Sequence, residues 1–333
     1  MNLKTPKEGE YLETVEGVVF GVKGIIHPPT HIIAFPKYVP NGKERKGYRK
    51  LDSLESSYKF LQENYPEYLR HDPVFNEVLG EVPKTRVKKI FSPQETLQNL
   101  LKKEKLDEVE KDCIDFVKLL GEYSSIPLLK LGVSGSVMLG LHTKDSDIDI
   151  VVYGENLCFL VYQALKKMVK EETSVKQYTE KDLLRLYSFR VKDTFMSFNQ
   201  FVKTETRKVL QGRFRQREYF VRLVKEPWEI GEKYGEKYYV PMGFVELEAE
   251  VTEDREAIFT PVRYPLRNVS VMKGADDVDV REVVSFRGRF CEQAKKFEKI
   301  FVRGKLEKVL SIRGEYCRVL VGARKEDVLI PLD

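Results

Sequence analysis

The chain has 333 residues, of which 42% are hydrophobic and 33% charged, and a formal net charge of +5. A chain of this length ordinarily forms more than one hydrophobic core, so we expect two or three domains. No apolar run approaches membrane-spanning length, and none of the four cysteines forms a Cys-x-x-Cys pair, which disfavours a membrane span and a structural zinc site. A cytoplasmic protein is the simplest class, and its modest positive charge allows an acidic partner. The interspersed Lys, Glu and Arg are typical of thermophile proteins.

Residues 1–91 predict a small α+β domain. Apolar runs at 17–22 and 31–35 indicate strands on either side of a His-Pro-Pro turn, and a second turn at 40–43 precedes a helical pattern at 51–64. A last strand is expected at 86–90. We find no catalytic constellation in this domain.

The middle region, 92–242, begins with Ser-Pro-Gln-Glu at 92–95, which predicts a capped helix start with proline in its first turn. Apolar residues at helical spacing continue this helix until Pro127. The elements expected after it are a strand at 128–133, a helix start at 136–141, a strand at 148–153, a helix at 157–168, a polar helical stretch at 181–213 and a strand at 219–224.

The last region, 243–333, reads as all-β. Residues 245–251 alternate between apolar side chains and glutamates, as expected of a strand with one buried face. The further short strands expected are at 258–261, 280–287, 300–308, 316–321 and 328–331. A small β-barrel or sandwich fits this spacing. Its basic and aromatic residues could bind single-stranded nucleic acid. We slightly favour the alternative, in which this region is a packing domain that binds no nucleic acid.

One motif contains the candidate catalytic residues. It consists of Gly135-Ser136, a spacer of ten residues, and Asp147-x-Asp149 inside an apolar strand. Aspartates two apart in a strand project from one face, so their oxygens can share divalent cations. Mg²⁺ prefers carboxylate oxygens combined with substrate phosphates. The competing interpretation is a strand end with two solvated acids, which Asp-x-Asp alone would favour.

Gly135 and Ser136 stand where the preceding strand turns into a helix. Backbone N–H groups at such a turn favour an anion. Ser136 can donate its hydroxyl to a phosphate, and Gly135 lets the backbone approach closely. The two halves of this motif therefore predict a nucleotide-phosphate site beside a metal site.

At these residues the chain resembles the DNA polymerase beta-like nucleotidyltransferase superfamily, in its minimal form, and in particular predicted archaeal nucleotidyltransferases. The resemblance implies transfer of a nucleoside monophosphate from an NTP to a hydroxyl, with release of pyrophosphate. It also implies that Gly135 and Ser136 contact nucleotide phosphates, and that Asp147 and Asp149 bind Mg²⁺ or Mn²⁺. The matching order of elements covers about 92–225, with some twenty residues specific to the motif.

The family usually carries a third carboxylate on a later strand, and here the chain departs from the pattern. The strand at 219–224 contains Arg222 and no acid in its middle, and Glu218 stands only at its edge. The next strand presents Glu246, Glu248 and Glu250 on one face, and we select Glu248. Arg222 is expected to pair with a core acid or to meet a nucleotide phosphate.

A basic run surrounds Phe214 and comprises Lys203, Arg207, Lys208, Arg213, Arg215 and Arg217. These side chains could follow the phosphates of a nucleic acid or of a triphosphate. A solvated helix face explains the same residues equally well.

We therefore predict an α+β protein with a mixed-sheet, polymerase beta-like core. The expected domains are 1–91 (α+β), 92–242 (nucleotidyltransferase) and 243–333 (β-barrel or sandwich). The predicted function is metal-dependent transfer of NMP to a hydroxyl acceptor, with RNA or DNA favoured and a protein acceptor not excluded. The alternatives are a nucleic-acid-binding protein on a catalytically degenerate fold, and a regulator that modifies a protein partner. No membrane partner is expected.

Overall fold

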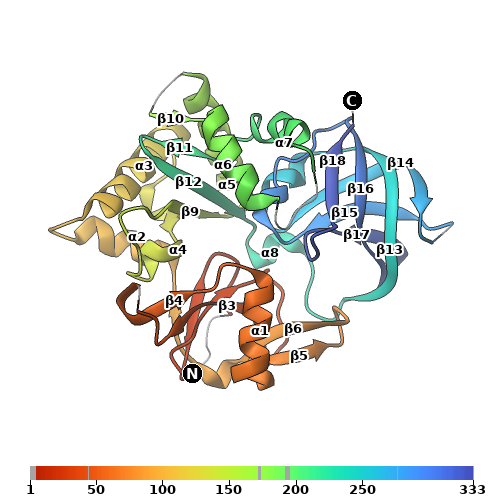
Figure 1. Cartoon of the computed structure of the whole chain (residues 1–333), viewed down its shortest axis with the longest axis horizontal. Helices are drawn as coiled ribbons and strands as arrows, with labels where there is room; N and C mark the ends of the chain where they lie inside the picture. The colour runs from red at the N-terminus through yellow and green to blue at the C-terminus, as the bar shows by residue number, and fades with distance from the viewer. Residues whose placement is uncertain (1–4, 44, 172–173, 192–195, 276, 333) are drawn as a thin grey trace. The chain divides into compact units, whose positions relative to one another are not determined.

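The computed structural model describes residues 5–43, 45–171, 174–191, 196–275 and 277–332 (Figure 1). Its chain divides into two compact units. The first contains residues 1–73, 77–167 and 214–234, and the second contains 74–76, 168–213 and 235–333. The proposed domain boundaries after residues 91 and 242 stay a prediction. No helix within the described ranges is both long and apolar enough to cross a membrane.

The first unit begins with a seven-stranded sheet in the order β5-β6-β3-β2-β1-β7, with β4 paired to β3. Leu12, Phe20 and Ile32 point into a core that α1 covers with Leu61, and all four are fully buried. The elements are β1 (Tyr11–Thr14), β2 (Val19–Val22), β3 (His31–Pro40), η1 (Arg45–Gly47), β4 (Tyr48–Lys50), α1 (Leu54–Asn64), η2 (Pro66–Tyr68), β5 (Leu69–Asp72), β6 (Glu77–Pro83), η3 (Lys84–Arg86) and β7 (Val87–Phe91).

The motif lies on a second, mixed sheet of this unit, in which β9 lies between antiparallel β8 and parallel β12. Ile148 and Ile150 are buried on the face that α3 covers, where Phe116 packs on Tyr219 with ring centroids 4.8 Å apart. The elements are α2 (Pro93–Lys102), α3 (Glu108–Ser124), η4 (Leu128–Lys130), β8 (Leu131–Val133), α4 (Gly135–Met138), β9 (Ile148–Tyr153), α5 (Glu155–Lys170), β12 (Arg217–Val224) and α8 (Pro227–Ile230).

The single helix expected between Pro93 and Pro127 is two helices, and that prediction was wrong. Ser92 caps α2 by accepting a bond from the Glu95 amide, as expected. Asp107 then caps α3 through its own reciprocal box with Glu110. A side chain that caps a helix start holds its own backbone out of helical geometry, so the chain breaks before Asp107.

The second unit ends in a β-barrel, which decides between the barrel and sandwich alternatives (cyan and blue in Figure 1). Strands β13, β14, β15, β17 and β16 pair in that order, and β16 closes the ring by pairing with β13. The elements of the unit are β10 (Val175–Lys176), α6 (Glu180–Arg190), α7 (Phe198–Glu205), β11 (Gln211–Phe214, ending where the chain returns to the first unit), β13 (Lys237–Val251), η5 (Arg255–Ile258), β14 (Val262–Lys273), β15 (Val280–Ser285), η6 (Gly288–Phe290), β16 (Lys299–Ser311), β17 (Gly314–Leu320) and β18 (Val328–Pro331).

Two expectations in this unit need correction or restriction. The expected strand at 258–261 is absent: Ile258 ends η5, Phe259 forms a single β-bridge, and β14 starts at Val262 instead. Pro265 lies inside β14, and a proline without an N–H weakens a strand pattern in sequence, which explains why this strand was missed. The polar helical stretch 181–213 forms α6 and α7, and its residues 192–195 lie outside the described ranges.

Candidate active site

The two halves of the motif meet at Gly135 and Asp149. Strands β8 and β9 pair with Val133 opposite Ile150, and the Ser134 amide donates to the Asp149 carbonyl oxygen at 2.8 Å. This bond places the start of α4 against the aspartate. Gly135 has a φ of +61°, and a Cβ built on it would lie 2.0 Å from Oδ2 of Asp149. Position 135 requires glycine for two reasons: its φ is positive, and a Cβ atom would clash with the Asp149 carboxylate.

The two motif aspartates differ in their surroundings. Asp147 directly precedes β9 and is exposed, whereas Asp149 lies within β9 and is partly buried. Burial raises the pKa of Asp149, and the charges of Arg222 and Lys50 offset part of that shift. Nowhere in the described ranges does the structure give its carboxylate a hydrogen bond or ion pair. A cation beside a partly buried carboxylate without such a partner would stabilise its ionised form.

The donor set therefore fits a divalent cation. Asp147, directly before β9, and Asp149, within it, offer carboxylate oxygens, which are the ligand type that Mg²⁺ and Mn²⁺ take in phosphate-handling sites. Gly135 and Ser136 stand beside them at the start of α4.

A second acidic group lies near the motif loop. Ligand atoms of Asp107, Glu110 and His142 are within 4.8 Å of one another and could hold an ion. Their present contacts already serve the fold. Asp107 caps α3 and accepts a bond from His142 Nε2 at 2.7 Å, and Glu110 pairs with Lys103 at 2.6 Å. The Lys103 ammonium already balances Glu110, and the aspartate pair as the cation site stays a prediction.

Parallel pairing between β9 and β12 brings Glu218 to the motif. Tyr219 is the partner of Ile148, and Phe220 is the partner of Asp149. Glu218 precedes Tyr219 as Asp147 precedes Ile148, so the two acids hold corresponding positions on neighbouring strands. The sequence analysis saw Glu218 only as a strand edge, because the register between the strands is not visible in sequence. Glu248 is exposed on β13 of the second unit and stays a prediction.

Arg222 pairs with an acid, one of the two roles expected for it. Its Nη1 donates to Glu8 Oε1 at 2.8 Å, and the Glu8 side chain is only 3% exposed. Glu8 also accepts the Gly24 amide at 2.7 Å. A role for Arg222 in nucleotide binding stays a prediction.

The N-terminal segment crosses the same face of the sheet as Asp149, which the sequence analysis missed. Ser134 Oγ donates to the Gly9 carbonyl at 2.7 Å, and the Tyr153 hydroxyl donates to the Glu8 carbonyl at 3.1 Å. A Cβ on Gly9 would lie 3.0 Å from both methyl groups of Val151. The region in which no catalytic constellation was found therefore forms one wall of the motif.

Two tyrosines of the N-terminal sheet continue this wall. Burial raises the pKa of Tyr38 to about 12, with contributions from Asp149 and Asp147, and the pKa of Tyr11 rises through burial and Asp149. Tyr38 packs against Leu141 of the motif loop. Both hydroxyls remain protonated at neutral pH, so they line the site as neutral groups.

Arg217 holds the loop that delivers Asp147. Its Nη1 donates to the Lys144 carbonyl at 2.7 Å and to the Ser146 carbonyl at 2.9 Å, while Nε donates to Asp112 at 3.1 Å. The guanidinium therefore connects α3 to the residues directly before Asp147. Its place in the basic run was the only sequence signal for it.

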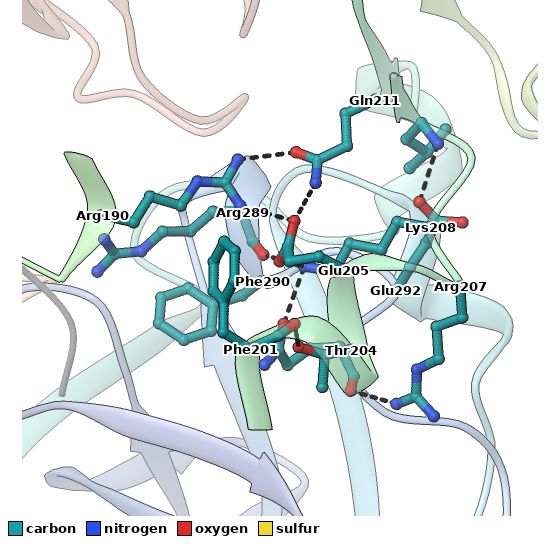
Figure 2. A network of polar contacts seen from close by, with 12 residues as sticks. Arg190, Phe201, Thr204, Glu205, Arg207, Lys208, Gln211, Arg289, Phe290 and Glu292 are labelled. Carbon is teal, nitrogen blue, oxygen red and sulfur yellow. Dashed lines mark hydrogen bonds and ion pairs between the residues drawn. The ribbon is translucent and has the colours of Figure 1, made fainter. Parts of the chain in front are cut away.

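Most of the basic run forms ion pairs with acids of the fold, in which Lys208 is buried and Arg215 remains exposed. Figure 2 shows the part around Glu205, which accepts bonds from Lys208 at 2.7 Å and Arg190 at 2.9 Å. The ion pairs of the run are Arg207–Glu298, Lys208–Glu205, Arg213–Asp182, Arg215–Asp112 and Arg217–Asp112. These charges connect helices and strands within each unit.

Comparisons with known proteins agree with this geometry. Residues 113–212 match a family model described as a nucleotidyltransferase domain, and this segment contains the whole motif. An uncharacterized protein of Methanocaldococcus jannaschii is 34% identical over 332 residues, with 95% of each chain covered. No solved structure matches the chain.

Proposed function

Because the chain belongs to the nucleotidyltransferase family, we propose that it transfers a nucleoside monophosphate from an NTP to a hydroxyl acceptor. The observation that carries the proposal is the contact of Gly135 with an Asp149 carboxylate that has neither a hydrogen bond nor an ion pair among the described residues. A glycine-containing turn that can bind phosphate lies directly beside a carboxylate that can bind a metal ion, and phosphoryl transfer uses both groups. The cytoplasm, which holds NTPs, is the proposed compartment.

Each residue of the motif has a role in the proposed reaction. Asp147 and Asp149 bind Mg²⁺ or Mn²⁺, which when bound polarises the phosphates and the attacking hydroxyl. Ser136 and the amides at the start of α4 hold phosphate oxygens. The acceptor oxygen bonds to the α-phosphorus, the bond to the bridging oxygen breaks, and pyrophosphate leaves. A carboxylate takes the hydroxyl proton.

We propose Glu218 as that third carboxylate, because its position on β12 corresponds to that of Asp147 on the paired strand β9. Glu248 remains the alternative. Glu218→Gln should lower kcat at least about a hundredfold, the usual contribution of a general base, while Glu248→Gln leaves kcat within a factor of two or so. The reverse result would assign the role to Glu248.

The function is tested by incubating the protein with each α-labelled NTP, Mg²⁺ or Mn²⁺, and RNA, DNA and protein acceptors. Wild type should transfer label, and Asp147→Ala and Asp149→Ala should not. Asp145→Ala is the matched control, since this exposed acid of the same loop lies outside the motif.

The destination of the label decides among acceptor classes. Label in RNA or DNA supports a nucleic-acid acceptor, and label in protein supports a regulator that modifies a partner. No transfer by wild type, with nucleic acid bound equally by the aspartate variants, would reject the enzyme in favour of a binding protein on a degenerate fold.

A further inference from the structure

A cluster of positive charge lies in the turn between β3 and β4 and in β4 itself. We call it the basic turn, and it comprises Lys43, Arg45, Lys46, Arg49 and Lys50. Four of these side chains are exposed, and Arg45 is half-buried. The turn lies outside the segment 113–212 that matches the family model, so it adds something that the shared domain does not supply.

The basic turn is held against the motif loop of the same unit. Arg45 Nη1 donates to the Leu141 carbonyl at 3.0 Å, and Leu141 packs with Tyr38 and Tyr48 on either side of the turn. The Lys46 ammonium lies 3.9 Å from the point that a Cβ on Gly140 would occupy. The turn therefore stands beside the loop that leads from α4 to Asp147.

Strand register separates the two cations of β4. Lys50 is the partner of Tyr38, and Arg49 is the partner of Val39. Tyr38 packs on the motif loop, whereas Val39 belongs to the core behind the sheet. Because side chains alternate along a strand, Lys50 shares the motif side and Arg49 points the other way. The positive charge of Lys50 also acts on Asp149.

Among the described residues, the cations of the basic turn have fewer acidic partners than those of the basic run. Among the described residues, Lys43, Lys46 and Arg49 form no ion pair, and Lys50 has only exposed Asp52 at 3.8 Å. Cations gathered beside a catalytic site without counter-charges raise the local concentration of anionic ligands. This arrangement suits a polyanion that approaches the motif from solvent.

We propose that Lys46 and Lys50 bind backbone phosphates of a single-stranded nucleic acid whose terminal hydroxyl is the acceptor. The inference rests on the proposed function, since it names the acceptor of that reaction. The charge of a triphosphate at Gly135 and Ser136 would be offset by the divalent cations of the aspartate pair. The backbone phosphates of a nucleic-acid strand have no such metal ions, so side-chain cations must offset their charge. Lysines provide flexible point charges that suit such a backbone.

The test measures binding of short fluorescein-labelled oligoribonucleotides and oligodeoxyribonucleotides by anisotropy at increasing KCl. For single strands, the slope of log K against log[KCl] changes by about 0.7 for each phosphate contact. Lys46→Gln and Lys50→Gln should each lower the slope by that amount. Arg49→Gln, a matched cation on the other side of β4, should leave the slope unchanged. As a control, the Tm of each variant should equal that of wild type, since the substituted side chains are exposed.

Transfer kinetics give a second readout. The two lysine variants should raise KM for the oligonucleotide about tenfold and leave KM for the NTP unchanged. An unchanged slope in both variants, an equal loss in Arg49→Gln, or a rise in KM for the NTP alone would overturn the inference. NMP transfer by wild type without lysine-dependent oligonucleotide binding also overturns it, whereas such binding without any NMP transfer overturns the proposed function.

Discussion

Gly135 and Asp149 are in such close contact that a single methyl group cannot fit between them. A Cβ on Gly135 would lie 2.0 Å from Oδ2 and 2.8 Å from Cγ of Asp149. The two residues are separated by the whole motif loop, so this contact joins its phosphate half to its metal half. Any side chain at position 135 must displace the Asp149 carboxylate, which we propose as a ligand of the cation.

Gly135→Ala should therefore abolish NMP transfer and destabilise the fold. A left-handed conformation alone costs an alanine about 1–2 kcal/mol, and the clash adds to it. Gly17→Ala is the matched control, because Gly17 has a φ of +82° and no atom within 4 Å of its Cβ position. Urea unfolding of both variants separates the cost of the left-handed backbone conformation from the cost of the clash with Asp149. Equal losses of stability, with transfer retained, would show that the contact has no consequence.

Asp149→Asn should stabilise the metal-free protein while abolishing activity. Burial raises the pKa of this carboxyl, so its ionised form opposes folding at neutral pH. Removing the charge should therefore raise the Tm of the metal-free protein. Mg²⁺ should raise Tm in wild type only. Asp147→Asn, at an exposed position, should lose the Mg²⁺ effect without the gain in Tm.

Arg217→Gln should lower metal-dependent transfer about 10–100-fold, the range found when a residue that orients metal ligands is lost. The reason is that Arg217 holds the Lys144 and Ser146 carbonyls next to Asp147. Arg215→Gln is the control, because Arg215 binds Asp112 and Asp115 without contacting the loop. The readout is the Mg²⁺ dependence of transfer, which a general loss of stability would shift equally in both variants.

The buried pair of Glu205 and Lys208 should be strongly coupled. Their side chains are 3% and 2% exposed. Burial would raise the pKa of Glu205, but Lys208 and Arg190 hold it below its ordinary value. Glu205→Gln should cost about 3–5 kcal/mol, since it leaves the buried Lys208 ammonium without its carboxylate. Lys208→Met should cost less, because Arg190 still pairs with Glu205. The double variant should cost clearly less than the sum. Additive losses in urea unfolding would contradict this coupling.

Stability should fall in acid through His27. Burial lowers its pKa to about 4, against the Pro6 carbonyl at Nε2, which raises it. The Ile33 amide donates to Nδ1, which can accept only while the ring is neutral. The unfolded chain binds a proton near 6.5 and the folded chain does not, so stability present above pH 6.5 is lost as pH falls towards 4. The loss should approach about 3 kcal/mol.

His27→Gln should remove this part of the pH dependence, because the amide can still donate to Pro6 without titrating. Unfolding free energies of both proteins across pH 4–7.5 make the comparison. Parallel curves for the two proteins would show that His27 does not contribute.

The sequence by itself determined the local features of the site. Gly135-Ser136 predicted a turn into a helix, and α4 starts at Gly135. Asp147-x-Asp149 predicted two acids in one strand, and the structure has Asp149 within β9 and Asp147 directly before it. These features depend on neighbouring residues, whose periodicity and backbone preferences are readable from a single chain. The barrel strands were mostly found for the same reason.

Only the tertiary structure decided which distant residues surround the motif. Glu8 meets Arg222, Arg217 reaches the loop before Asp147, and the basic turn comes to lie beside Leu141. Each contact depends on which strands pair and in which register, and many pairings satisfy one apolar pattern equally well. For the same reason, a run of arginines that looks solvated in sequence turns out to be paired with acids far along the chain.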